Sequence, residues 1–272
     1  MSPAATAQEC LLHLGVRRFL AGVPAAESVD AVVEETPVAL SYNGISHVVM
    51  MMTPADLEDF AIGFSLSEGI VADARDIRDM DIAEHGGGIE VSVSLSPERE
   101  HALKSLRRNL TGRTGCGLCG AESLDQAIRA VEPVPDGPSI RPVAVERACS
   151  ELPPLQMLSE RTGGAHAAAW CSEDGAVLLL REDVGRHNAL DKLIGALVRA
   201  GLDTAKGFAL VSSRASYEMV TKAARAGMRV LVAVSAPTTL AVSLAEQSNL
   251  SLVAFARPGK FSVYTVPARI DT

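Results

Sequence analysis

The 272-residue chain has few aromatic residues, few charged residues and no long apolar run. Aromatic residues make up 4% and charged residues 21%, whereas hydrophobic residues, mostly Ala, Val and Leu, reach 47%. Disordered chains combine low hydrophobicity with high charge, so this balance predicts a globular protein. No stretch approaches the roughly 18 uninterrupted apolar residues of a membrane span, and we therefore expect no membrane partner.

The chain also has no excess of basic residues. The chain has 25 Lys and Arg against 33 Asp and Glu, a net charge of −8. Such a charge disfavours nonspecific binding to nucleic acid or to an anionic membrane. The length is comfortable for two domains of roughly 100–200 residues each.

Cysteine is scarce, and the five cysteines contain only one close pair, Cys116 and Cys119. Secreted disulfide scaffolds are short and rich in cysteine, so we expect a reducing, cytoplasmic location. Residues 17–20 (RRFL) superficially match a twin-arginine export signal. The apolar stretch that follows is too short and contains Gly22 and Pro24, which argues against export.

We expect a poorly ordered arm over residues 1–28 and an α+β domain over 29–135. A second, α/β domain over 139–272 should follow a proline-rich linker at 133–138. In the first domain we predict strands near 38–40, 46–51 and 89–95. Thr53, Pro54 and Asp56 offer a capping box for a helix that ends near Gly69. The remaining predictions in this half are helices over 97–110 and 123–131 and a glycine-rich loop over 111–120.

The second half of the sequence has a different pattern of apolar segments. Two apolar segments, 167–171 and 176–180, flank a turn-like sequence, which predicts a β-hairpin. A helix is expected over 189–200. Strands near 208–212, 229–234 and 250–255 then alternate with helices near 216–226 and 239–247. This alternation predicts parallel strands joined by crossover helices, in a sheet that is covered on both faces.

The pair Cys116 and Cys119 is the strongest chemical signal. Two thiols at this spacing can form a disulfide, ligate a soft metal or exchange persulfide sulfur, whereas inert cysteines are usually buried among apolar residues. Nearby Arg113 would lower a thiol pKa and increase the thiolate fraction. A structural zinc site needs four ligands, and Cys10, Cys149 and Cys171 supply no second pair, so no metal is expected.

Two catalytic uses of a CxxC pair fit less well. A deaminase-type zinc site requires a His-x-Glu motif and a proline before the first cysteine, but Gly115 stands there and no histidine has Glu two residues later. A thioredoxin-type pair belongs at the start of a helix in a βα unit. This pair lies in a glycine-rich segment instead.

A second constellation combines residues 163–166 (GGAH) with residues 182–188 (EDVGRHN). His166 begins a predicted strand and could simply be satisfied by backbone groups. The 182–188 segment precedes a helix and could bind an anion at the helix N-terminus, where unpaired N–H groups point outward. Capping and ion pairs are the plainer interpretation of its charges.

A third constellation follows three successive strands of the second half. Open α/β sheets bind ligands at the carboxyl ends of their strands, so side chains that follow these strands are candidates for a phosphate-binding rim. They are Ser212, Ser213 and Arg214, then Ser235 and Thr238, then Phe255, Arg257 and Lys260. No P-loop and no Gly-x-Gly-x-x-Gly motif accompanies them, so ordinary ATP or NAD sites are not supported.

Five blocks in this order resemble the FdhD family, from about residue 30 to the C-terminus. They are 114–120 (TGCGLCG), 163–166 (GGAH), 182–192 (EDVGRHNALDK), 213–219 (SRASYEM) and 235–238 (SAPT). The resemblance implies a sulfurtransferase required for formate dehydrogenase activity. Such proteins take persulfide sulfur from a cysteine desulfurase and deliver it to the bis-molybdopterin guanine dinucleotide molybdenum cofactor. It also implies a homodimer and a C-terminal domain with the cytidine-deaminase fold.

Carried onto this chain, the resemblance makes Cys116 the persulfide-carrying residue and Cys119 the second thiol. The segment that matches the family's guanine-nucleotide site is Phe255, Ala256, Arg257, Pro258, Gly259 and Lys260, and GDP should be a partial mimic of the cofactor. His166 and His187 join the candidate binding residues. The residues alone leave two alternatives open: a CxxC disulfide oxidoreductase, and a cofactor-binding chaperone of formate dehydrogenase that transfers no sulfur.

Overall fold

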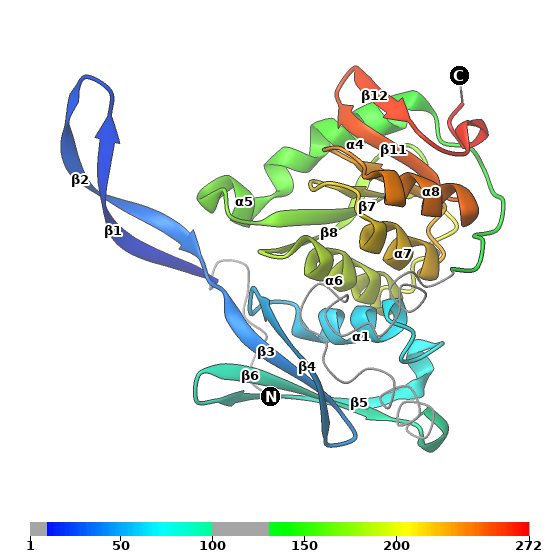
Figure 1. Ribbon diagram of the computed structural model, residues 1–272, viewed down its shortest axis with the longest axis horizontal. Helices are drawn as coiled ribbons and strands as arrows, with labels where there is room; N and C mark the ends of the chain where they lie inside the picture. The colour runs from blue at the N-terminus through cyan, green and yellow to red at the C-terminus, as the bar shows by residue number, and fades with distance from the viewer. Residues whose placement is uncertain (1–9, 100–130, 272) are drawn as a thin grey trace.

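The computed structural model describes residues 10–99 and 131–271, which form three β-sheets and the helices packed on them (Figure 1). A two-stranded hairpin leads into a four-stranded sheet, and a six-stranded sheet follows. None of the helices in the described ranges is long and apolar enough to span a membrane.

The elements before the gap are β1 (Leu11–Leu20), β2 (Val23–Val33), β3 (Thr36–Tyr42), β4 (Ile45–Met52), α1 (Leu57–Ser67), the 3-10 helix η1 (Ala74–Asp76), β5 (Ile77–His85) and β6 (Gly88–Leu95). The elements after it are α4 (Pro142–Leu155), α5 (Met157–Thr162), β7 (His166–Cys171), β8 (Val177–Asp183), α6 (Arg186–Arg199), β9 (Phe208–Val211), α7 (Tyr217–Arg225), β10 (Val230–Ala233), α8 (Thr239–Gln247), β11 (Ser251–Arg257), β12 (Lys260–Val263) and η2 (Pro267–Arg269).

The four-stranded sheet has the order β4-β3-β6-β5, with only β3 and β6 parallel. Its inner face buries alternate residues of β3 and β6, among them Leu40 and Val91, against Phe60 of α1. The predicted strands near 38–40, 46–51 and 89–95 are confirmed. β5 was not predicted, because the adjacent charged residues Arg78 and Asp79 interrupt the alternation of apolar and polar positions.

The N-terminal arm differs from the prediction. Residues 11–33 form an antiparallel hairpin with one register shift, between Arg18 and Leu20, and its two strands meet at a turn where Gly22 takes a φ of +77°. Most of its side chains are exposed on both faces. A strand without a buried face need not alternate apolar and polar residues, and the sequence of β2 shows no such alternation.

The predicted capping box at Thr53 is also wrong. The helix begins four residues later, and Asp56 at its N-cap has a left-handed backbone and makes no side-chain cap. Thr53 is instead fully buried between the two halves of the chain, where its hydroxyl accepts a hydrogen bond from the Val184 amide (3.2 Å). The contact with residues distant in sequence, rather than local capping, decides this conformation. The helix does end before Gly69, as predicted.

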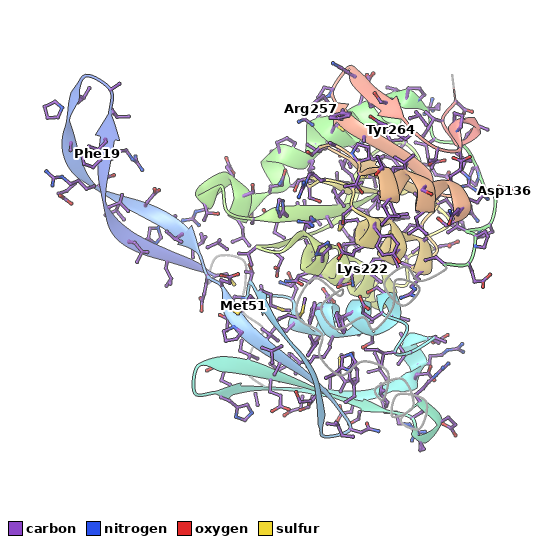
Figure 2. The ribbon with its side chains drawn as sticks, in the orientation of Figure 1. Phe19, Met51, Asp136, Lys222, Arg257 and Tyr264 are labelled. Carbon is purple, nitrogen blue, oxygen red and sulfur yellow. The ribbon has the colours of Figure 1, made fainter. Side chains whose placement is uncertain are left out.

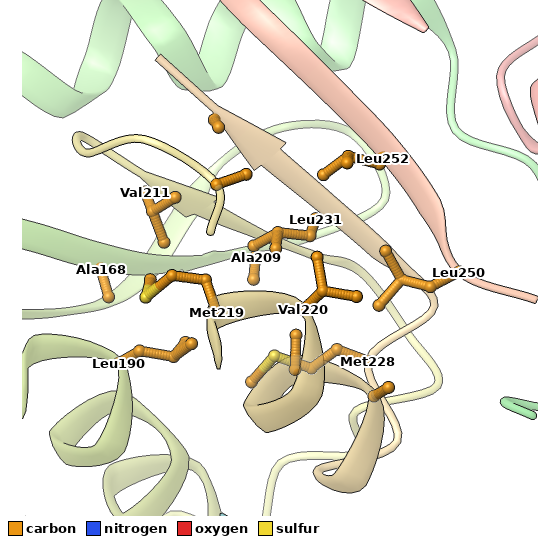
Figure 3. Close-up of a cluster of buried hydrophobic side chains, with 14 of the residues drawn as sticks. Ala168, Leu190, Ala209, Val211, Met219, Val220, Met228, Leu231, Leu250 and Leu252 are labelled. Carbon is orange, nitrogen blue, oxygen red and sulfur yellow. The ribbon is translucent and has the colours of Figure 1, made fainter. Parts of the chain in front are cut away.

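The six-stranded sheet has the order β12-β11-β10-β9-β7-β8. β9, β10 and β11 are parallel, as predicted, whereas β7 and β12 run antiparallel to their neighbours. α4 covers one face, and α6, α7 and α8 cover the other (Figure 1). Figure 3 shows this second layer, where Met219 and Leu190 from the helices pack against Ala209 and Leu231 from the strands.

The predicted hairpin, the three later strands and helices α6, α7 and α8 are confirmed. α4 was not predicted, since Pro142 begins it and Pro153 and Pro154 lie in its last turn. Residues 131–139, which include the predicted linker, have no regular structure. The boundaries of the two predicted domains remain a prediction, because the loop 111–120 and most of the helices predicted over 97–110 and 123–131 lie outside the described residues.

α1 and α6 hold the two halves together at very short range. A Cβ atom on Gly63 would lie 1.7 Å from the Asp191 carbonyl oxygen, and one on Gly195 would lie 1.9 Å from the Asp59 carbonyl oxygen. Beside this crossing, the ammonium of Lys222 is buried against the Asp191 carboxylate (2.9 Å). The small N-terminal sheet, α1 and the C-terminal layers therefore pack as consecutive layers (Figure 1).

Candidate anion-binding site at the strand ends

The six-stranded sheet has one edge at which several elements meet. β8, β9, β10 and β11 run in the same direction and end there, whereas β7 begins there. Because each of β8, β9 and β10 is followed by a helix, α6, α7 and α8 all begin at this strand-end edge. Their first N–H groups and the positive ends of three helix dipoles therefore lie along one side of the sheet.

Backbone hydrogen bonds connect the segments that follow the strands. The Ser235 amide donates to the Ser213 carbonyl (3.3 Å), and the Thr238 amide donates to the Ala215 carbonyl (3.0 Å). The Phe255 amide in turn donates to the Ser235 carbonyl (3.1 Å). The three segments that the sequence proposed as a rim are thus adjacent in the folded chain.

Several of the predicted hydroxyl groups serve the fold. The Ser212 hydroxyl accepts a hydrogen bond from the Ala167 amide (2.8 Å) and fixes the start of β7. Ser213 is buried and donates to the Arg214 carbonyl (3.1 Å). Thr238 caps α8 by accepting from the Ala241 amide (3.2 Å). Of the three predicted serines, Ser235 is half-buried and has no side-chain hydrogen bond among the described residues.

The segment 255–260 forms the outer part of the edge, where β11 turns into β12. Phe255 has a left-handed backbone (φ +54°) and an exposed ring. The Arg257 guanidinium donates to the carbonyls of Val234 and Ala256, which fixes it against the end of β10. Lys260 is exposed, as are Pro258 and Gly259, whereas Ala256 is buried. Figure 2 shows Arg257 beside this turn.

The segment 182–192 separates into an inner and an outer set of side chains. The inner set is structural: Glu182 accepts from the Leu158 and Ser159 amides (2.8 and 2.9 Å), and burial raises its pKa. Asp183 and Lys192 form a fully buried ion pair (2.6 Å). The plainer interpretation of these charges, as caps and ion pairs, is therefore correct for this inner set.

Arg186 and His187 form the outer set, in the first turn of α6. The His187 Nε2 atom lies 3.0 Å from a Glu218 carboxylate oxygen, and the hydrogen bond from His187 lowers the Glu218 pKa below its usual range. The Ser216 hydroxyl donates to the same carboxylate (3.3 Å). The first turns of α6 and α7 are thus joined through the side chains of His187 and Glu218.

His166 lies close to this pair. Burial lowers its pKa below the usual 6.5, and the neighbouring charges of Arg186 and His187 lower it further. The Arg186 Nε atom is buried and has no hydrogen-bond partner in the described part of the chain. A buried donor without a partner is costly, so an anionic acceptor at this position would be stabilising.

The structure thus brings together His166, His187 and the three predicted strand-end segments. Ser216 and Glu218 lie in the 213–219 block but were not among the predicted site residues, although an acidic residue in the first turn of a helix was a usable signal. Cys116 and Cys119 lie outside the described residues, and their relation to this edge stays a prediction. Within the described ranges, no three His, Cys, Asp or Glu side chains converge as metal ligands.

The fold defines an α/β protein whose strand-end edge is a candidate anion-binding site, and comparison with known proteins gives the family. The FdhD/NarQ family model matches residues 33–271. The sulfur carrier protein FdhD of Cupriavidus necator is 56% identical over 90% of this chain and 85% of its own length. The protein of the same name from Bordetella petrii is 49% identical over 98% of this chain and 96% of its own.

A crystal structure from Desulfotalea psychrophila, described as that of a candidate formate dehydrogenase accessory protein, has the same fold. It superimposes with a TM-score of 0.79 at 24% sequence identity and covers 96% of this chain and 100% of its own. The chain belongs to the FdhD/NarQ family.

Proposed function

We propose that this protein is a sulfur carrier for formate dehydrogenase. It takes persulfide sulfur from a cysteine desulfurase on Cys116 and Cys119 and delivers it to the bis-molybdopterin guanine dinucleotide molybdenum cofactor. The observation that carries the proposal is the edge at which three helix N-termini meet cationic side chains in a chain of net charge −8. Relatives named as sulfur carrier proteins support the same assignment.

The cofactor, as the bound substrate, carries several phosphates, and the strand-end edge is suited to them. Helix N-termini bind phosphate through free N–H groups. The exposed cations Arg214 and Lys260 would add charge, and the buried Arg186 Nε atom would gain an acceptor. The exposed ring of Phe255 would pack against the guanine base. GDP presents the same base and two phosphates, so we expect it to bind as a partial mimic.

The thiol chemistry balances without a metal on the carrier. The Cys116 thiolate attacks the terminal sulfur of the donor persulfide, the donor S–S bond breaks, and the desulfurase cysteine leaves as a thiolate. Attack of Cys119 on the Cys116 sulfur would then release hydrosulfide at the acceptor and leave a Cys116–Cys119 disulfide. The sulfane sulfur gains two electrons and the two thiols lose them, so a cellular thiol reductant must reopen the disulfide.

The finer parts of the proposal concern fold and setting. β7, β8 and the three parallel strands, with helices on both faces, are consistent with a cytidine-deaminase-like domain that lacks the deaminase zinc motif. The catalytic subunit of formate dehydrogenase would be the receiving partner. The sulfur chemistry needs reduced thiols, which favours the cytoplasm.

Mass spectrometry after incubation with a cysteine desulfurase and cysteine tests the sulfur step. We expect one added sulfur atom on the 113–120 peptide of the native protein and none in Cys116→Ser, which also fails to mature formate dehydrogenase in cells. Cys119→Ser should keep part of the loading, and Cys149→Ser is the matched control. If Cys116→Ser still yields active dehydrogenase, the chaperone alternative replaces the carrier. A Cys116–Cys119 disulfide that forms in the absence of desulfurase and cysteine, in a protein that takes up no sulfane sulfur when they are added, would favour the oxidoreductase.

Calorimetry with GDP tests the binding site. Lys260→Ala and Arg257→Ala should each weaken binding about tenfold, since a hydrogen bond to a charged group contributes roughly 1.5–3 kcal/mol. Lys206 is an exposed lysine just before β9, at the opposite edge of the sheet, so Lys206→Ala is the matched control. Unchanged affinity in both test variants would move the site to the 182–188 segment.

A further inference from the structure

Three basic side chains from two elements lie together at the strand-end edge. His166 begins β7, and Arg186 and His187 are the first two residues of α6. His166 pairs with Asp183 across β7 and β8, so the turn from β8 into α6 lies beside it. All three basic side chains are half-buried. This basic cluster, His166, Arg186 and His187, is therefore partly shielded from the solvent that would screen its charge.

The acidic groups around the basic cluster already have partners of their own. The Asp183 carboxylate is fully buried against a lysine ammonium of α6 (2.6 Å) and accepts further hydrogen bonds from backbone and amide groups. The Glu218 carboxylate lies 3.0 Å from the His187 Nε2 atom. Among the described residues, no carboxylate forms an ion pair with Arg186 or His166. The basic cluster therefore keeps an excess of positive charge.

One donor of the basic cluster has no acceptor. The Arg186 Nε atom is buried and bonds to no group in the part of the chain that the structure describes. A buried donor without a partner is costly, so such donors in folded proteins are normally bonded to protein, water or a ligand. The guanidinium fork matches the geometry of an oxyanion, which accepts two parallel hydrogen bonds from it. An oxyanion is therefore the ligand that best satisfies Arg186.

The protonation of His166 depends on the charge beside it. Burial lowers the pKa of His166, and the positive charges of Arg186 and His187 lower it further, whereas the negative charge of Asp183 has a smaller, opposite effect. The free imidazole is therefore neutral at pH 7. An anion beside Arg186 would offset the neighbouring positive charge and favour the imidazolium. Anion binding and protonation of His166 therefore stabilise each other.

We propose that Arg186 and His166 form a subsite for a doubly charged oxyanion, such as a phosphate or sulfate group, and that His166 takes up one proton from solvent when the anion binds. The Arg186 guanidinium and the protonated imidazole both donate to the anion, and no covalent bond changes. The subsite rests on the proposed function only for its natural ligand, a phosphate group of the cofactor. It would be a second point of attachment beside the segment 255–260.

Histidine NMR of the native full chain measures the proton directly. Titrations over pH are compared in sodium sulfate and in sodium chloride of equal ionic strength, because sulfate stays doubly charged over this range and any added proton belongs to the protein. The His166 signal, identified by its loss in His166→Gln, should titrate at a higher pH in sulfate. The signal of His85, an exposed histidine of β5, is the internal control and should not differ between the salts. Equal midpoints for His166 would overturn the proposal.

Sulfate affinity in variants, followed by the same spectra, assigns the two roles. The native protein should bind sulfate about tenfold more tightly at pH 5.5 than at pH 8, because binding is linked to the uptake of one proton. His166→Gln should lose this pH dependence. Arg186→Gln should weaken binding about tenfold at both pH values, and Arg186→Lys, which keeps the charge but not the Nε donor, should not restore it. His85→Gln and Arg78→Gln, both at exposed positions of β5, are the matched controls.

GDP distinguishes the two sources of the oxyanion. If a nucleotide phosphate occupies the subsite, GDP displaces sulfate, whereas a subsite for a free oxyanion binds sulfate together with GDP. Absence of sulfate binding, or a native pH dependence that His166→Gln retains, would overturn the subsite even in a protein that binds GDP and loads sulfur on Cys116. Conversely, a protein that binds sulfate with proton uptake but loads no sulfur keeps the subsite and loses the proposed function.

Discussion

The crossing of α1 and α6 permits a quantitative test of how the two halves are joined. Gly195→Ala would place a methyl group 1.9 Å from the Asp59 carbonyl oxygen, against an ordinary contact of at least about 3.2 Å. The helices must therefore separate by roughly 1 Å, which opens the packing of both cores. Overpacking of this kind costs about 3 kcal/mol, and the higher helix propensity of alanine offsets about 1 kcal/mol.

We therefore expect Gly195→Ala to lower the free energy of unfolding by about 2 kcal/mol, measured by urea denaturation. Gly86→Ala is the matched control, because a Cβ there meets no atom within 4 Å and the residue has no left-handed backbone; its effect should be small. Gly63→Ala should resemble Gly195→Ala, and the double variant should cost less than the sum, since one separation relieves both clashes. A neutral or stabilising Gly195→Ala would refute the close crossing.

Three other predictions follow from two paired charges and from the buried thiols. Glu218→Gln should destabilise by about 1–2 kcal/mol at pH 7. The folded pKa of Glu218 lies below 4.5, so this difference should disappear as the pH falls through that folded value, as urea titrations at several pH values would show. Lys222→Met leaves the Asp191 carboxylate buried without its cation and should lower the free energy of unfolding by about 3–5 kcal/mol. The additional change Asp191→Leu should restore most of that lost stability. A double variant whose loss is simply the sum of the two single losses would contradict this account. Burial raises the pKa of Cys149 to about 11 and also raises the pKa of Cys171. Neither thiol should therefore react with a thiol reagent in the native protein at pH 7. Rapid labelling of either cysteine would contradict the packing.

Local chemistry in the sequence was sufficient for much of the C-terminal half. The strands β9, β10 and β11 are short apolar runs bounded by glycine, serine or proline, and the helices between them keep helical spacing. Such patterns depend on near neighbours only, so they predict the elements and the order in which they alternate. Because parallel strands end at one edge, the sequence also predicted that the segments after them would meet.

Contacts between residues distant in sequence decided the rest. The 182–192 segment reads as one charged motif, yet Asp183 and Lys192 are buried as a pair while Arg186 and His187 lie at the strand-end edge. Thr53 matches a helix cap in sequence but serves as a hydrogen-bond partner of Val184. The exposed hairpin had no buried face to leave a pattern. A charged or polar side chain gives the same local signal whether it is paired inside or presented outside, and only the packing of the whole chain determines which of the two occurs.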